Sequence, residues 1–406
     1  MRNSRRRWLP AMLATTLVCG MISGLAQDPG KRAREMWIAA ASQNIFGLKL
    51  LANEAARHPR QNVFLSPLSI YLALAMTESG AAGETRAAMR RTLAVPAGMS
   101  EDALHEAASA LSKELRSRKD LELSVANALW SDTSMPFAPA FVKHCRDFYE
   151  AEAKTIDFHK PDAADIINAW VRRKTQDKIP AIVTPDVVAM SKAILTNAVY
   201  FKAAWLHQFS KGETTDGAFH LASGKSKTVP LMHHASLAGA YRSGDGFEAA
   251  ELPYGNSRMV LYAILPAPGS SPEQALTKVA IEKLIASTAS SELDLRLPRF
   301  ALDFSTRLKE PLTSMGMGIA FRYPGAEFAP LGSPLYFIGE VLHKTRLEIN
   351  EEGTMAAAVT AVTMKDGHAL RAGKQKKVLV FDRPFGLLLC DTVTGTVLFE
   401  GVVNEP

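Results

Sequence analysis

The distribution of apolar residues predicts that the first half of the chain is rich in helices. One face of the first such segment carries apolar residues at helical spacing: Ile38, Ala41, Ile45, Leu48 and Ala52. A second helix is expected to begin with Ser66 as its N-cap and Pro67 as its first residue, and to end near Gly80. A third is expected after Ser100, and a fourth over residues 168–178.

Strand patterns take over from about residue 121. Apolar and polar residues alternate over 121–125, 293–297 and 347–350, as they do in half-buried strands. The continuous apolar runs 193–201 and 259–265 are typical of central strands that are covered on both faces. Because no internal repeat and no low-complexity linker divides the chain, we predict a single α+β domain after the N-terminal segment.

The N-terminal segment has the organisation of a secretory signal peptide. Arginines near the start precede an apolar stretch over residues 8–19, and small residues at 24–26 offer a cleavage site before Gln27. We therefore expect residues 1–26 to be removed, leaving a secreted or periplasmic domain over 27–406. The arginines also resemble a twin-arginine export signal, so the export route stays open. Lipidation at Cys19 is disfavoured because a bulky valine precedes it.

Composition and charge are those of an ordinary soluble globular protein. The 406 residues include 47 Lys and Arg, 41 Asp and Glu, and 47% apolar residues. Removing the four arginines of the signal segment lowers the net charge from +6 to +2, so the charge gives no support for nucleic-acid binding. A local basic cluster at Lys113, Arg116, Arg118 and Lys119 is expected to be a solvated helix end. Beyond the N-terminus, no apolar run approaches the length of a membrane span.

Common catalytic and cofactor-binding motifs are absent from the sequence. There is no Gly-x-Ser-x-Gly nucleophile motif, no complete phosphate-binding loop and no complete dinucleotide fingerprint. His233 and His234 are adjacent on an expected strand and so point to opposite faces, which makes them poor joint metal ligands. Cys145 and Cys390 are expected to be buried apolar side chains. The sequence therefore predicts no catalytic residue, no metal site and no cofactor.

Five segments, taken together and in order, resemble the serpin family. They cover the chain from about residue 37 to its end, which makes the resemblance specific although each segment alone would be weak. The segments are 62–70 with Gly80, Ala81 and Thr85; 197–205 with Phe209 and Thr214; 343–354; 382–385; and 398–401.

The resemblance implies a serpin-like single domain of about nine helices and three β-sheets with an exposed reactive-centre loop at about 351–377. A target protease would cleave this loop and form an acyl-enzyme, and insertion of the loop into the main sheet would trap the protease. The implied partner is thus a serine endopeptidase, or alternatively a cysteine endopeptidase, bound covalently by a monomer. The implied hinge residues are Glu351, Glu352, Gly353, Thr354, Met355, Ala356, Ala357 and Ala358.

The hinge composition itself favours insertion into a sheet. Residues 353–358 are all uncharged, and all except Met355 are small, so they can enter between packed strands. In a strand, Thr354 and Ala356 fall on one row and Met355 on the other. The family usually has Glu where this chain has Met355. Because that position belongs to the row expected to be less buried, insertion is expected to survive the difference.

The scissile bond can be placed at two positions, depending on which end of the loop the residues are counted from. Counting 17 residues from Glu351 ends at Gly367, whereas counting back from Pro384 favours residues 370–373. A basic residue before the bond would suit a trypsin-like protease, and leucine a chymotrypsin-like or elastase-like one. The candidate reactive-centre residues are Lys365, Gly367, His368, Leu370 and Arg371.

The resemblance also assigns residues to the region that must open during insertion. Ser66, Ser69, Asn197 and His343 would form a polar cluster beneath the main sheet, and Trp205 would lie near the insertion point. Two other functions remain as alternatives. One is a carrier or chaperone with the same fold but without inhibition. The other is a hydrolase, for which the sequence offers no assembled nucleophile and base.

Overall fold

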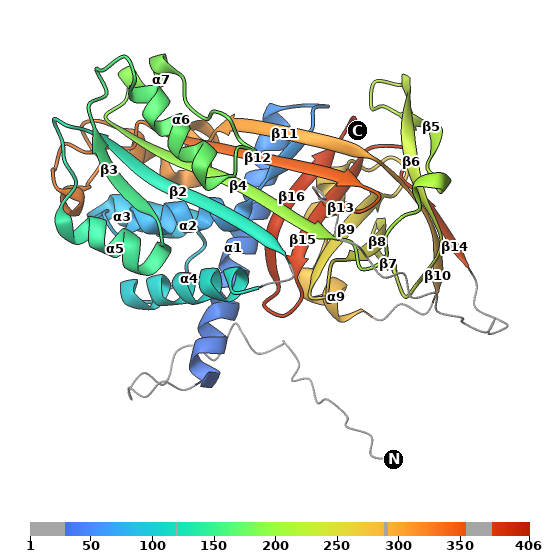
Figure 1. The fold of residues 1–406 in the computed structure, drawn as a ribbon. Helices are drawn as coiled ribbons and strands as arrows, with labels where there is room; N and C mark the ends of the chain where they lie inside the picture. Colours follow the sequence, from blue (N-terminus) through green and yellow to red (C-terminus); the bar gives the residue numbers. More distant parts are fainter. Residues whose placement is uncertain (1–28, 119–120, 288–290, 355–375) are drawn as a thin grey trace.

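The computed structural model describes residues 29–118, 121–287, 291–354 and 376–406. The expected signal peptide and Cys19 lie outside these residues. Within the described ranges, no helix is both long enough and apolar enough to cross a membrane. The predicted α+β class with three sheets is confirmed (Figure 1).

Ten α-helices occur in the described part of the chain, and seven of them lie before residue 190. Their bounds are α1 (Pro29–Arg57), α2 (Pro67–Glu78), α3 (Gly83–Thr92), α4 (Glu101–Arg116), α5 (Pro139–Tyr149), α6 (Ala163–Lys174), α7 (Pro185–Ala189), α8 (Pro272–Thr277), α9 (Ile281–Ala286) and α10 (Lys309–Leu312).

The predicted helix starts at Ser66 and Ser100 are confirmed. Each serine hydroxyl accepts a hydrogen bond from the backbone N–H three residues later, which satisfies a donor that the helix leaves free. The helix expected over 168–178 is displaced, since α6 runs from Ala163 to Lys174. The reason lies at Thr175, whose hydroxyl donates to the carbonyl of Val171 and accepts from the N–H of Ile179, so the chain turns there.

The main sheet contains six strands in the order β11, β12, β13, β4, β2, β3. β4 runs antiparallel to β2 and parallel to β12, and β11 runs antiparallel to β12. The strand bounds are β2 (Glu122–Asp132), β3 (Glu152–Ile156), β4 (Ala193–Ala204), β11 (Phe300–Arg307), β12 (Glu340–Asn350) and β13 (Gly353–Thr354).

Two smaller layers complete the domain. A second six-stranded sheet has the order β1, β16, β15, β9, β8, β7, and a four-stranded sheet has the order β14, β10, β6, β5. Their bounds are β1 (Val63–Leu65), β5 (Thr215–His220), β6 (Ser226–Ala238), β7 (Tyr241–Gly244), β8 (Phe247–Pro253), β9 (Met259–Pro266), β10 (Glu292–Pro298), β14 (Lys377–Val380), β15 (Phe385–Asp391) and β16 (Thr396–Val403). Every strand predicted from the apolar pattern is present.

Helices cover both faces of the main sheet. Alternate residues of β2 enter different cores: Leu129 packs in the large core with α2, whereas Trp130 packs with Trp170 of α6. Figure 1 shows α6 and α7 lying across the front of β2, β4 and β12. Any strand that enters between β12 and β4 must therefore displace contacts on the α6 and α7 side.

The two cysteines of the described residues are free and buried, as predicted. Burial raises the pKa of Cys145 to about 12, and it raises the pKa of Cys390 as well. Thiols that stay protonated are poor nucleophiles, so neither cysteine is a candidate for covalent catalysis.

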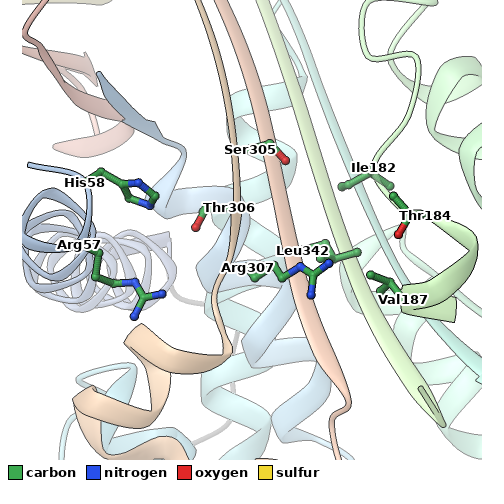
Figure 2. A pocket seen from close by; sticks show the side chains of 9 residues that line it. All are labelled: Arg57, His58, Ile182, Thr184, Val187, Ser305, Thr306, Arg307 and Leu342. Atoms are coloured by element: carbon green, nitrogen blue, oxygen red, sulfur yellow. The ribbon is translucent and has the colours of Figure 1, made fainter. Parts of the chain in front are cut away.

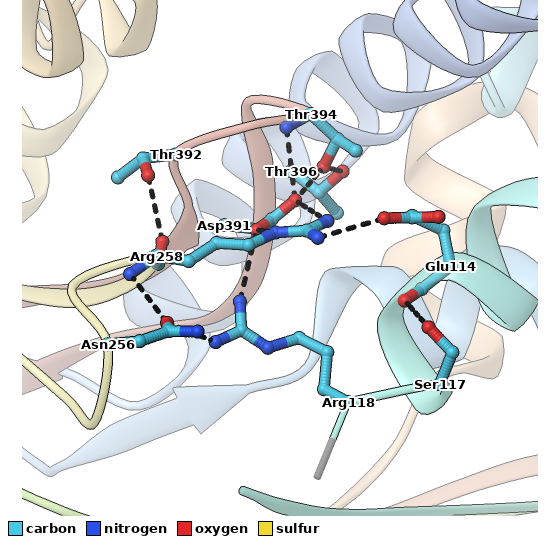
Figure 3. A network of polar contacts seen from close by, with 9 residues as sticks. All are labelled: Glu114, Ser117, Arg118, Asn256, Arg258, Asp391, Thr392, Thr394 and Thr396. Atoms are coloured by element: carbon cyan, nitrogen blue, oxygen red, sulfur yellow. Dashed lines mark hydrogen bonds and ion pairs between the residues drawn. The ribbon is translucent and has the colours of Figure 1, made fainter. Parts of the chain in front are cut away.

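The two arginines of the basic cluster at the end of α4 are held by polar contacts, which corrects the expectation of a solvated helix end for Arg116 and Arg118. Lys113 is exposed, as expected, and Lys119 lies outside the described residues. The Arg116 guanidinium pairs with Glu150 at 3.1 Å, and the Arg118 side chain is only 4% exposed. Arg118 donates to Asn256 at 2.8 Å and lies 3.8 Å from Asp391, which also receives a bidentate pair from Arg258 (Figure 3). The network holds the end of α4 against β15, so these arginines are structural.

Glu400, at the centre of β16, carries a buried carboxyl group without a partner. Its side chain is fully buried, and neither carboxyl oxygen has a hydrogen-bond partner among the described residues. Burial raises its pKa from the ordinary 4.5 to about 8. The unfolded chain therefore loses the proton near pH 4.5 while the folded protein keeps it. Stability contributed by the protonated group is complete below pH 4.5 and declines as the pH rises towards 8.

We expect Glu400→Leu to be more stable to heat than the natural chain, with a difference that grows from pH 5 to pH 8. At pH 8 the difference is expected to reach a few kcal/mol, on the order of 1.4 kcal/mol for each unit of pKa shift. Differential scanning calorimetry across this range measures it. Glu405→Gln, a substitution at an exposed glutamate in the same C-terminal segment, should keep the natural pH dependence. If the stability of Glu400→Leu changed with pH in the same way as that of the natural chain, the prediction would be wrong.

Candidate functional site

The segment predicted to be the hinge enters the main sheet. The chain leaves β12 at Asn350, turns, and returns as β13, which pairs with β12 on one side and β4 on the other. Thr354 lies opposite Ile349 and Ala203 in the two ladders. Gly353 and Thr354 therefore already lie between β12 and β4 as a short strand.

Below β13 the same two strands are joined directly. Residues 340–346 of β12 pair in parallel with residues 194–200 of β4. β12 and β4 are thus separated by β13 at one end and hydrogen-bonded to each other along the rest of their length. We call this line of direct pairing between β12 and β4 the seam. If the chain continued as a strand beyond Thr354, it would have to separate β12 from β4 along those seven pairs.

The turn before β13 is held by specific contacts. The Glu351 carboxylate is buried and accepts hydrogen bonds from the Thr214 hydroxyl at 2.8 Å and from Arg299 at 3.3 Å. The Glu352 carboxylate pairs with Lys211 at 2.6 Å, and its carbonyl accepts from the N–H of Trp205. Both glutamates therefore fix the point from which the hinge enters the sheet.

Gly353 allows β13 to approach β4 closely. A Cβ atom at this position would lie 2.2 Å from the carbonyl oxygen of Ala203 and 2.8 Å from Cα of Ala204. Both neighbours are backbone atoms of a central strand and cannot move aside. Its φ of +155° is also one that residues with side chains rarely adopt.

We expect Gly353→Ala to expel β13 from the sheet, because the added methyl group cannot be accommodated against β4. Hydrogen–deuterium exchange of peptides covering β13 and the end of β12 should become about tenfold faster or more, as it does when about 1.4 kcal/mol of local protection is lost. Gly212→Ala is the matched control, since the nearest atom to its added Cβ would be 3.8 Å away. Unchanged exchange in Gly353→Ala would show that β13 does not depend on this close approach.

Thr354 faces the interior of the protein. Its side chain is fully buried, and its hydroxyl forms a hydrogen bond with that of Tyr254. The Tyr254 ring stacks on Trp205 with 4.3 Å between ring centres, and the Trp205 indole donates to the carbonyl of Asn350 at 2.8 Å. Trp205 thus lies beside β13, near the position expected of it. Met355, Ala356, Ala357 and Ala358 lie outside the described residues.

The four residues predicted to form a polar cluster do lie together under the seam. The N–H of Ser66 donates to Nε2 of His343 at 3.2 Å, and Nδ1 of His343 lies 2.5 Å from Oδ1 of Asn197. The amide of Asn197 in turn reaches both the hydroxyl of Ser69 and Oδ1 of Asn127. This network crosses from α2 to β4 and β12, the two strands that insertion would separate.

The contacts of His343 define its charge and its tautomer. Since Nε2 accepts from a backbone N–H, the proton is on Nδ1, which donates to Asn197. Complete burial lowers the pKa of His343 to about 3, so the ring is neutral at physiological pH. The cluster is therefore a neutral hydrogen-bond network.

Several residues of this site were not found from the sequence. Asn127 interrupts an otherwise apolar stretch of β2, and a buried polar residue in such a run is a signal that could have marked it. Tyr254 and Arg299 gave no such signal, because their partners are distant in sequence. The candidate reactive-centre residues Lys365, Gly367, His368, Leu370 and Arg371 lie outside the described residues.

Comparisons with known proteins agree with this geometry. The family described as Serpin (serine protease inhibitor) matches residues 41–406. An uncharacterized serpin-like protein of Thermococcus kodakarensis is 34% identical over 351 residues, which are 85% of this chain and 81% of that protein. The leukocyte elastase inhibitor of Bos taurus is 31% identical over 381 residues, covering 90% and 99% of the two chains.

Solved structures show the same fold. The thermophilic serpin tengpin in its native state has a TM-score of 0.80 at 27% identity, covering 95% of this chain and 96% of its own. Thyroxine-binding globulin in complex with thyroxine has a TM-score of 0.79 at 25% identity, covering 92% and 99%. The match over nearly the whole length, together with the arrangement of β12, β13 and β4, shows that this chain belongs to the serpin family.

Proposed function

We propose that this serpin is a suicide inhibitor of serine endopeptidases, with cysteine endopeptidases as the alternative target class. Cleavage of the loop after the hinge would leave the protease esterified to the new carboxyl end. The loop would then continue β13 down the seam between β12 and β4, carrying the protease with it. The protein would act as a monomer and would be consumed in the reaction.

The observation that carries this proposal is the position of β13. Gly353 and Thr354 already occupy the entrance between β12 and β4, and three alanines follow Met355 in the sequence. Each added strand residue would gain backbone hydrogen bonds worth about 0.5 to 1.5 kcal/mol net. An intact protein that withholds this pairing stores the free energy that trapping needs.

The chemistry of the loop limits the choice of protease. Lys365 or Arg371 before the scissile bond would favour a trypsin-like enzyme, and Leu370 a chymotrypsin-like or elastase-like enzyme. If residues 1–26 act as a signal peptide, the targets are extracellular or periplasmic proteases.

A non-inhibitory carrier is the second candidate. The similarity to thyroxine-binding globulin favours it, since that protein is solved with a small molecule bound. A carrier would not require small residues throughout the hinge. The two candidates predict different outcomes when the loop is cut, because only the inhibitor couples cleavage to loss of protease activity.

Titration of proteases against the full chain tests the proposal. Trypsin, chymotrypsin and elastase are each incubated with increasing amounts of protein, and residual protease activity is measured. We expect at least one enzyme to be inactivated irreversibly at a ratio near one to one. Cleavage of the loop by all three enzymes without any loss of activity would support the carrier instead.

A further inference from the structure

A cavity of about 350 Å³ opens on the face of the main sheet that carries α7. It lies between the end of α1, the end of β11 and the segment that leads through α7 into β4 (Figure 2). Its lining residues are Arg57, His58, Ile182, Thr184, Val187, Ser305, Thr306, Arg307 and Leu342. The volume falls within the range of about 300 to 1,000 Å³ that is usual for small-molecule sites.

One side of the cavity is neutralised within the protein. The buried carboxylate of Glu54 accepts from the hydroxyl of Thr306 at 2.6 Å and lies 3.5 Å from Arg57 and 3.6 Å from His58. Arg57 also pairs with Glu310 at 2.5 Å. These ion pairs balance the charges on this side of the cavity and leave little charge for a ligand.

The other side of the cavity carries a cationic side chain, Arg307, that has no hydrogen-bond or ion-pair partner among the described residues. The acidic group that its charge influences, Glu340, is already bonded to a backbone N–H. Figure 2 shows the Arg307 guanidinium on the side of the cavity that Val187 and Leu342 line. The Ser305 hydroxyl is likewise without a hydrogen bond to a described residue and lines the same cavity.

We propose that this cavity binds a small organic anion with an apolar body. The anionic group would accept hydrogen bonds from Arg307, which offers a planar set of donors suited to carboxylate or sulfonate oxygens. The apolar body would lie against Ile182, Val187 and Leu342. A cation beside an apolar wall selects this class over neutral molecules and over simple inorganic anions.

The position of the cavity connects binding to insertion of the loop, a consequence that rests on the proposed function. Leu342 belongs to β12 and lies opposite Thr196 of β4 in the seam that an inserted strand would part. Ile182 and Val187 belong to the segment that leads into β4. An occupant would therefore contact β12 on one side and the segment that precedes β4 on the other, and would hold the two together. We expect it to slow insertion and to divert cleaved molecules from trapping to release.

Fluorescence titration of the full chain tests the binding site. The probe is 8-anilinonaphthalene-1-sulfonate, an apolar ring system with one anionic group, and N-phenyl-1-naphthylamine is its counterpart without the sulfonate. We expect saturable binding of the sulfonate probe, weakened about tenfold or more by Arg307→Gln, as loss of a charged hydrogen-bond donor predicts. The neutral probe should bind both proteins equally. Arg296→Gln, an exposed arginine of β10 in another sheet, is the matched control and should bind like the natural chain.

Absence of saturable binding, or equal affinity in Arg307→Gln, would overturn the site. The second arm measures how many inhibitor molecules are consumed per protease, with and without the sulfonate probe. The probe should raise this ratio in the natural chain and in Arg296→Gln, and much less in Arg307→Gln. If the probe binds but leaves the ratio unchanged, the link to insertion is wrong. If no protease is inhibited at all, the proposed function fails while the binding arm still decides the site.

Discussion

Cleavage within the reactive loop is expected to raise the unfolding temperature by roughly 10 °C or more. In the intact protein, Gly353 and Thr354 are the described residues of the loop that pair between β12 and β4. After cleavage, about a dozen further residues would pair with both strands, each adding about 0.5 to 1.5 kcal/mol of hydrogen bonding together with apolar burial. Calorimetric scans of intact and loop-cleaved protein measure the difference.

Two results can be told apart in this measurement. A large rise shows that the intact form withholds a strand, as an inhibitor that works by insertion requires. Coinciding transitions would contradict insertion and favour the carrier function. Cleavage outside the loop, for example between α4 and β2, serves as a control, because it opens the chain without freeing a strand and should not stabilise it.

Substitution of Thr354 by Arg is expected to convert the inhibitor into a substrate. The Thr354 side chain is fully buried and hydrogen-bonded to Tyr254, so an arginine there must bury an unpaired guanidinium or leave the sheet. Either outcome slows insertion. Since trapping competes with hydrolysis of the acyl-enzyme, each 1.4 kcal/mol on the insertion barrier changes the outcome about tenfold. The measurement is the number of inhibitor molecules consumed per protease inactivated, which should rise at least about tenfold.

Two neighbouring substitutions make this prediction specific. Ala356→Arg falls on the same row as Thr354 and should act similarly, whereas Met355→Arg falls on the opposite row and should be tolerated better. If Met355→Arg raises the ratio as much as Ala356→Arg does, the predicted alternation is wrong. If none of the three changes the ratio, the loop does not act by insertion.

The sequence predicted those parts of the structure that depend on local chemistry. Ser66 and Ser100 mark helix starts because a hydroxyl followed by a free N–H three residues later is a local arrangement. The alternation of 347–350 is likewise visible before folding, because strand side chains alternate in direction. The residues Ser66, Ser69, Asn197 and His343 could be grouped only through the family resemblance.

What the sequence did not predict depends on contacts between distant segments. The depth at which the hinge enters the sheet follows from the fit of Gly353 against Ala203, 150 residues earlier in the chain. The pairing of Arg118 with Asp391 joins segments that no local pattern connects. Nor does the pattern around Glu400 indicate that its carboxyl group is buried without a partner.

Intact-mass analysis of a mixture of this serpin and an inhibited protease, under denaturing conditions, tests covalent trapping most directly. We expect a species whose mass is that of the protease plus the chain up to the scissile residue, together with a released C-terminal fragment. The fragment should begin between residues 366 and 374, which would also identify the scissile bond. Free protease of unchanged mass, accompanied only by the serpin cut in two, would contradict trapping.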